Sequence, residues 1–134
     1  MTVQNSVAAR NARLDAFEGA VGTSPKLQIR TGAQPANCAA AATGTLLAEI
    51  SLPADWLAAA SGGTKSLSGT WSGSAAAAGT AAHYRIVDTA GTTCHEQGSV
   101  TGIGGGGDMT VDNPVLAVSQ TVIVTAYTRT AGNA

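Results

Sequence analysis

Charged side chains are scarce in this sequence. Asp, Glu, Lys and Arg make up 11% of the 134 residues, and the formal net charge is −1. A typical soluble domain carries about 25% charged residues. Because neither sign dominates, the sequence lacks the electrostatic footprint of a protein that binds nucleic acid or an anionic membrane. A weakly charged surface suits either an ordinary soluble domain or a subunit that packs against neighbours.

Long hydrophobic runs are absent, and cysteine is rare. No stretch reaches the roughly 20 apolar residues that span a bilayer, and residues 1–13 lack the apolar segment of a secretory signal. We therefore expect the chain to fold in a cytoplasm. The two cysteines are Cys38 and Cys94. In a reducing compartment such thiols are usually free, whereas a disulfide that forms later, outside the cell, is the alternative.

Aromatic residues make up only 4% of the chain. The expected core is built from small aliphatic side chains around five large rings: Phe17, Trp56, Trp71, Tyr84 and Tyr127. A small core makes an isolated domain only marginally stable. We therefore expect a homo-oligomer, either a dimer or a trimer.

One helix is predicted, over about residues 6–21. Its apolar positions form a narrow stripe at near-helical spacing: Val7, Leu14, Phe17 and Val21. Asn5 or Ser6 can cap the start, and Gly22 followed by Pro25 ends the helix. Such a stripe suits a helix that lies on its own sheet or one that pairs with a partner subunit. Both interpretations stay open at this point.

Beyond the helix the pattern changes to the alternation of half-buried strands. Strands are predicted over 26–31, 46–52, 65–71, 83–88, 93–100, 109–111 and 121–130. A short helical turn is expected over 53–60, a small-residue linker over 73–79, a hairpin turn over 89–92 and a glycine-rich loop over 102–107. These elements predict a mainly β chain, an antiparallel, jelly-roll-like β-sandwich with one N-terminal α-helix. The expected organisation is an arm and helix over 1–22 and a sandwich domain over 23–134.

Candidate chemistry is concentrated in Cys94, His95 and Glu96, with His83 on the facing strand of the expected hairpin. Alternation along a strand places Cys94 and Glu96 on one face and His95 on the other. Because no paired ligands such as C-x-x-C occur, we expect no metal and instead a polar contact from His83 to His95 or Glu96. The glycine run 102–107 lacks the Lys-Ser/Thr of a phosphate-binding loop, and no G-x-S-x-G elbow is present. We expect neither an enzyme nor a cofactor.

Several stretches are similar to a known class of proteins. They cover residues 27–35, 42–48, 58–63, 78–81, 85–86, 105–113 and 122–132. In this order the stretches resemble small structural proteins of tailed-bacteriophage virions, of the head-decoration, cement or neck-associated kind. The resemblance implies a virion component and supplies no catalytic residues. The cysteines at positions 38 and 94 depart from it and leave open a cross-link that is specific to this virion.

The resemblance leads to a functional hypothesis. We expect a capsid-decorating or cementing protein that is made in the host bacterial cytoplasm and binds the major capsid protein and copies of itself non-covalently. The alternatives are a neck, collar or tail-spike subunit, which would bind neck proteins, and a carbohydrate-binding adhesin in which Trp56 or Trp71 stacks on a sugar. The residues expected at the interface are Val7, Leu14, Phe17, Val21, Gly105, Gly106 and Asp108.

Overall fold

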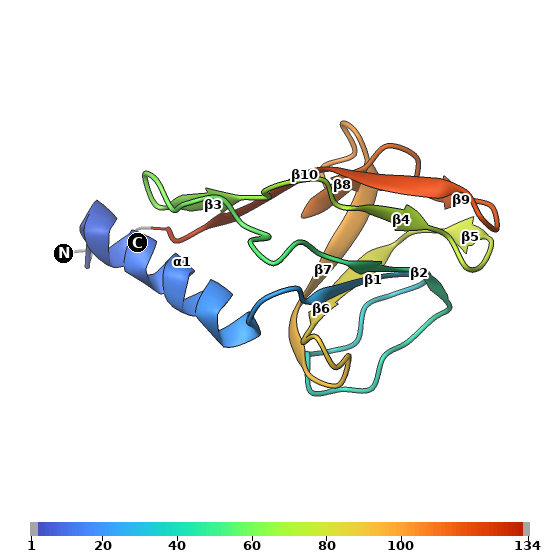
Figure 1. Ribbon diagram of the computed structural model, residues 1–134, viewed down its shortest axis with the longest axis horizontal. Helices are drawn as coiled ribbons and strands as arrows, with labels where there is room; N and C mark the ends of the chain where they lie inside the picture. Colours follow the sequence, from blue (N-terminus) through green and yellow to red (C-terminus); the bar gives the residue numbers. More distant parts are fainter. Residues whose placement is uncertain (1–2, 133–134) are drawn as a thin grey trace.

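The computed structural model describes residues 3–132 and contains one helix and ten strands (Figure 1). The elements are α1 (Val7–Val21), β1 (Lys26–Arg30), β2 (Leu46–Ser51), β3 (Thr64–Ser66), β4 (Ser72–Ser74), β5 (Gly79–Thr80), β6 (His83–Val87), β7 (Cys94–Gly102), β8 (Met109–Val111), β9 (Val115–Leu116) and β10 (Thr121–Thr130). The expected domain ranges 1–22 and 23–134 include residues 1, 2, 133 and 134, which lie outside the described residues.

Eight strands form one curled sheet in the order β2-β1-β6-β7-β8-β10-β3, with β4 also paired to β10. A small ribbon joins β5 and β9. The curl brings the edge strand β2 close to the segment that follows β4, where the amide of Ala76 donates to the carbonyl oxygen of Leu47 at 2.7 Å. Among residues 3–132, every strand pair except β7–β8 is antiparallel. The predicted β-sandwich-like fold with one N-terminal helix is confirmed.

All five aromatic rings of the chain stack into one row through the core. The ring centroids lie 6.2 Å apart for Phe17 and Trp56, 5.9 Å for Trp56 and Trp71, 5.2 Å for Trp71 and Tyr127, and 6.2 Å for Tyr127 and Tyr84. Both tryptophans are fully buried. Edge-to-face and tilted contacts of this kind add to the free energy gained by burial. The row therefore links the helix to the sheet.

The ends of α1 follow from its sequence. The hydroxyl of Ser6 accepts a hydrogen bond from the amide of Ala9 at 3.1 Å, so Ser6 is the N-cap. Gly22 ends the helix with a φ of 92°, and its amide donates to the carbonyl oxygen of Glu18. Glycine adopts this positive φ without the steric cost that other residues meet. The predicted start and end of the helix are confirmed.

The helix packs on its own chain, beside β3 and the end of β10 (Figure 1). The ammonium group of Lys65 on β3 pairs with Asp15 and Glu18 of α1. The guanidinium of Arg129 on β10 lies 3.6 Å from the centre of the Phe17 ring. These contacts hold the polar and apolar sides of the helix against the sheet. Of the two interpretations of the apolar stripe, packing on its own sheet is the one observed.

The predicted helical turn over 53–60 is wrong. This segment is irregular, and its backbone pairs with the chain around β3. The amide of Ala58 donates to Ser66, and the carbonyl oxygen of Trp56 accepts from Ser68. Trp56 and Leu57 are both buried, and Leu57 forms an isolated antiparallel bridge with Leu67. Burial of this pair overrides the local helical preference.

The glycine loop, residues 103–108, connects β7 to β8, and these two strands pair in parallel. Parallel strands usually need a connection of a dozen or more residues. The short return depends on glycine: Gly104 and Gly106 have positive φ values of 82° and 80°. A Cβ atom on Gly107 would lie 2.9 Å from the amide nitrogen of Thr101. The loop therefore packs tightly against its own strand.

Candidate functional site

A polar cavity of about 490 Å³ lies beside Glu96 on β7. The side chain of Glu96 reaches into the space between β6 and β10. One of its carboxylate oxygens accepts hydrogen bonds from the hydroxyls of Tyr84, at 2.6 Å, and Tyr127, at 2.7 Å. The other oxygen pairs with the guanidinium of Arg129. One carboxylate thus joins three strands.

The electrostatics of this cavity favour a structural role, in which non-covalent contacts join the strands, over a reactive centre. Tyr84 and Tyr127 are only 2% and 3% exposed, and burial raises the pKa of both phenols above the usual range. Both phenols therefore keep their protons at neutral pH and act as hydrogen-bond donors. Burial also lowers the pKa of Arg129, although a guanidinium stays charged in proteins. One oxygen of Glu96 accepts from the two phenols, and the other pairs with the guanidinium of Arg129.

His83 does not make the contact expected from the sequence. The register of the β6–β7 hairpin places His83 opposite Ser99 and places Ile86 opposite Glu96. The His83 side chain is buried, and its Nδ1 atom lies 2.8 Å from the carbonyl oxygen of Gly32. The prediction of a polar contact with His95 or Glu96 is therefore wrong. A bulge between the turn and His83 shifts the register by one residue, and the sequence of the turn does not reveal it.

Cys94 and Glu96 do not share a face, contrary to the expectation from simple alternation. The register of the hairpin shifts between Ile86 and Val87, and such a bulge reverses the alternation on one side of it. Glu96 lines the cavity with Tyr84, whereas Cys94 lines a separate hollow of about 280 Å³ on the opposite side. The bulge thus separates the two chemical groups.

The two cysteines meet in that second hollow. Their sulfur atoms lie 2.8 Å apart, and both thiols are free and half-buried. Cys38 belongs to the long connection 31–45, which covers the outer face of β6. The guanidinium of Arg85 on β6 donates to the carbonyl oxygens of Cys38, at 2.9 Å, and Ala40, at 3.1 Å. The structure therefore brings together the two cysteines named in the sequence analysis, and hydrogen bonds from Arg85 fix the loop that carries Cys38.

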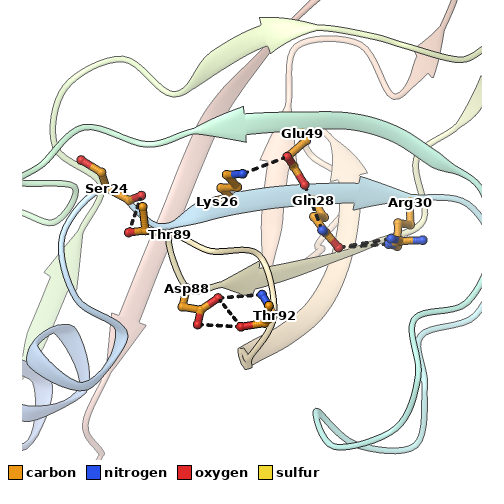
Figure 2. Close-up of polar contacts among 8 residues, drawn as sticks. All are labelled: Ser24, Lys26, Gln28, Arg30, Glu49, Asp88, Thr89 and Thr92. Carbon is orange, nitrogen blue, oxygen red and sulfur yellow. Dashed lines mark hydrogen bonds and ion pairs between the residues drawn. The ribbon is translucent and has the colours of Figure 1, made fainter.

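A ladder of polar side chains runs along β1 and β2 (Figure 2), and two of its members, Gln28 and Arg30, line the same hollow. Lys26 lies 3.6 Å from Glu49, whose other oxygen accepts from the Gln28 amide at 3.0 Å. The guanidinium of Arg30 donates to the Gln28 side-chain oxygen at 3.2 and 3.3 Å. Partial burial, followed by the nearby charge of Arg85, lowers the pKa of Arg30. These groups satisfy one another along the strands, as is typical of a solvated face.

The expected interface residues of the helix are mostly turned inward. Leu14 and Val21 are 3% and 4% exposed, and Phe17 packs in the aromatic row. Val7 is 50% exposed. Leu14, Phe17 and Val21 therefore stabilise the chain's own core, and Val7 is the member of the stripe that a neighbour can reach.

The expected interface residues of the glycine loop also make internal contacts. A Cβ atom on Gly105 would lie 2.6 Å from the Thr101 side chain, whereas a Cβ atom on Gly106 would meet no atom within 4 Å. The carboxylate of Asp108 accepts from the amide and hydroxyl of Ser99 at 2.9 and 3.0 Å. The neighbouring Ile103 is 74% exposed. The loop therefore presents an aliphatic side chain on a tightly built support.

Two stretches of the chain carry no charged side chain. The segments 66–82 and 113–128 contain no Asp, Glu, Lys, Arg or His. The fold brings these two segments together, because β4 pairs with β10 and β5 pairs with β9. Figure 1 places β4, β5 and β9 together, away from α1. We call the surface formed by residues 72–82 and 113–123 the charge-free end; Asp112 borders it, because its carboxylate accepts from the amide of Ile123 at 3.0 Å.

The charge-free end exposes large aliphatic side chains that the sequence analysis did not single out. Val115, Val118 and Ile123 are 60%, 63% and 40% exposed. The signal that could have found them is the length of the two uncharged runs. Recognising that the runs share one surface requires the strand pairing, which local sequence does not provide.

Comparisons with known proteins add no relative: no family model matches the chain, and no curated protein or solved structure is similar to it. Among residues 3–132, no helix has both the length and the apolar character needed to cross a bilayer. In the same part of the chain, no three His, Cys, Asp or Glu side chains gather in an arrangement that could hold a metal ion.

Proposed function

We propose that this chain is a structural subunit of a tailed-bacteriophage virion that decorates or cements the capsid. In this role it binds the major capsid protein and copies of itself without covalent bonds, and the charge-free end is the main contact surface. The observation that carries the proposal is the joining of two uncharged segments into one surface with three exposed aliphatic side chains. The resemblance of the sequence to small virion proteins supports the same role.

A surface of this composition is suited to permanent contact. Burying a valine or isoleucine side chain contributes about 1.5–3 kcal/mol, and no charge has to be removed from water when two such surfaces meet. The curled sheet and the row of stacked rings provide a stiff support beneath the surface. Many weak contacts of this kind, repeated over a shell, oppose its rupture because each copy bridges neighbouring subunits.

The test is to locate the chain on purified particles. Antibodies raised against the recombinant protein are applied to virions and imaged by immunogold electron microscopy. We expect gold over the whole head surface. Particles that carry no label, together with no peptide of the chain in their mass spectrum, would reject a virion role altogether.

The alternative within the structural class is a neck, collar or tail-spike subunit. The same labelling experiment separates the two positions, because a neck component would be marked at one vertex and would be present in about a dozen copies per particle. An adhesin is less well supported, because Trp56 and Trp71 are both fully buried and cannot stack on a sugar. A glycan array with the recombinant protein tests that role directly.

A further inference from the structure

The thiols of Cys38 and Cys94 lie in direct contact although they are 56 positions apart in the sequence. The contact joins two different elements: Cys38 belongs to the connection 31–45, and Cys94 begins β7. Both side chains are half-buried. A small oxidant in the solvent can therefore reach the pair without unfolding of the sheet.

Other contacts already hold the connection 31–45 in the position that a bond between the sulfurs requires. Arg85 donates to the carbonyl oxygen of Cys38 itself. Next along the sheet, the side-chain amide of Gln97 on β7 donates to the carbonyl oxygen of Pro35 at 2.6 Å. Arg85 and Gln97 face each other across the β6–β7 pair. The loop is thus tied to both strands on either side of Cys38, so closing the bond needs little movement of the backbone.

We propose that Cys38 and Cys94 form an intramolecular disulfide when the folded chain meets an oxidising environment, and that this bond fastens the connection 31–45 to β7. The oxidant that we assign is a small-molecule disulfide. In the first step a protein thiolate attacks one sulfur of the oxidant, forms a mixed disulfide and releases one small thiol. In the second step the other cysteine attacks the protein sulfur of the mixed disulfide and releases the second small thiol. The two protein thiols are oxidised, and their protons and electrons end on the two small thiols.

The surroundings of the two sulfurs set the order of these steps. Burial, together with the hydrogen bond to Cys38, raises the pKa of Cys94 to about 12. Cys94 therefore keeps its proton at neutral pH and is a poor first nucleophile. In the same contact the Cys94 thiol donates to the Cys38 sulfur, so we expect Cys38 to carry the mixed disulfide and Cys94 to resolve it.

The experiment exposes the reduced, folded protein to oxidised glutathione at neutral pH. We expect an intact mass lower by about 2 Da, because two hydrogens leave, and a protease digest that contains one peptide joining Cys38 to Cys94. The melting temperature should rise on the order of 10 °C, because the bond restricts a long loop of the unfolded chain. A reducing agent should reverse both changes.

Two single variants serve as controls. In Cys94→Ser the mixed disulfide on Cys38 has no resolving thiol, so one glutathione should stay attached. In Cys38→Ser the remaining Cys94 should accumulate far less of this glutathione adduct. Both variants should lose the rise in melting temperature under oxidising conditions while their melting in reducing buffer stays within a few degrees of the parent.

Three results would overturn the proposal. The first is a folded protein whose two thiols both still react with iodoacetamide after prolonged oxidation. The second is a covalent dimer on a non-reducing gel in place of the internal bond. The third is an internal bond that leaves the melting temperature unchanged or lowers it, which would contradict the fastening of the loop.

Discussion

Glu96 shows how one residue organises the sheet. Its carboxylate accepts from two tyrosine hydroxyls and pairs with Arg129, and its side chain is 12% exposed. Such a charge can stay buried because two hydroxyls donate to it and a guanidinium pairs with it. The aromatic row and this carboxylate meet at Tyr84 and Tyr127. The Glu96 carboxylate therefore orients the two tyrosine rings at one end of the aromatic row.

We expect Glu96→Gln to lower the free energy of unfolding by about 2 kcal/mol. The amide cannot balance the charge of Arg129, although the exposed third of that side chain lets water compensate in part. Urea unfolding followed by tryptophan fluorescence measures the change. The matched control is Glu49→Gln in the solvated ladder, which should cost less than about 0.5 kcal/mol. Equal effects of the two substitutions would contradict a special role for Glu96.

Three buried groups predict a loss of stability at alkaline pH. Free cysteine and tyrosine ionise near pH 9.0 and 10.0, whereas burial raises the pKa of Cys94 to about 12 and raises those of Tyr84 and Tyr127 further. Above about pH 9 the unfolded chain loses protons that the folded chain still holds, so rising pH favours unfolding. The contribution of these groups is complete below pH 9 and is lost progressively above it.

The measurement is the urea midpoint of the reduced protein at about pH 7, 9 and 10.5. We expect these groups to leave the urea midpoint unchanged between the first two pH values. The midpoint should fall clearly at the third. Cys94→Ser should reduce the fall, because serine does not ionise in this range. A midpoint that is constant up to the highest pH would show that these groups ionise equally easily in the folded chain.

At the scale of elements, Lys65 provides the ion pairs between α1 and β3, beside the hydrogen bonds from Arg10 to the carbonyl oxygen of Ala131 and from the amide of Gly63 to Asn11. Lys65 is only 5% exposed and pairs with Asp15 and Glu18. Burial opposes its charge, but the hydrogen bonds to the two carboxylates outweigh this effect and raise the pKa of Lys65. The lysine therefore holds the helix where Phe17 can enter the aromatic row.

We expect Lys65→Met to lower the free energy of unfolding by about 1–2 kcal/mol, because two carboxylates lose their counter-charge and Asp15 is well exposed to water. The more specific readout is hydrogen exchange, which should become faster across α1 and stay unchanged in β6 and β7. Lys26→Met, in the solvated ladder, is the matched control. Unchanged protection of α1 would show that the helix stays in place without the ion pairs of Lys65.

The tight loop between β7 and β8 predicts that alanine substitutions at two glycines have opposite effects on stability. A methyl group on Gly107 would collide with the backbone of Thr101, whereas one on Gly19 would project from α1 into open space. We expect Gly107→Ala to destabilise the chain by about 1–3 kcal/mol and Gly19→Ala to stabilise it by about 0.5–1 kcal/mol. Thermal unfolding of both variants measures the contrast. A neutral Gly107→Ala would mean that the loop relaxes freely.

Local sequence determines most elements but not their partners. The helix is predictable because Ser6 and Gly22 mark its ends, and the alternation over 121–130 predicts the last strand. The segment 53–60 is not predictable, because its shape comes from burying Trp56 and Leu57 against distant strands. For the same reason the sequence placed Cys94 with Glu96: a bulge in the hairpin register depends on the facing strand. Contacts such as Cys38–Cys94 arise from the topology.

At the scale of the whole molecule, charge is distributed unevenly. Charged side chains occupy the helix, the outer face of β1 and β2, and the cavity beside Glu96. The charge-free end has none, although it is built from two separate runs of sequence. Exposed aliphatic side chains at such an end are costly for an isolated chain and useful for one that is covered by a neighbour.

The proposed role predicts that charges at this end abolish particle binding without unfolding the chain. We expect the double variant Val115→Asp and Val118→Asp to keep its melting temperature within a few degrees, because both side chains are more than half exposed. Its binding to particles assembled without the chain should weaken at least tenfold, since buried aspartates would lack partners in the contact. Co-sedimentation of purified protein with the particles measures the affinity.

The matched control carries the same added charge elsewhere. Ala36→Asp with Ala41→Asp places two carboxylates on the exposed connection 31–45 and should bind like the parent. Ala12→Glu probes the exposed face of α1, the other surface that a neighbour can reach. If Ala12→Glu weakens binding and the valine variant does not, the helix is the contact and the charge-free end is not. Equal weakening by the two double variants would trace the effect to net charge, because both add two carboxylates and only a defined interface distinguishes their positions.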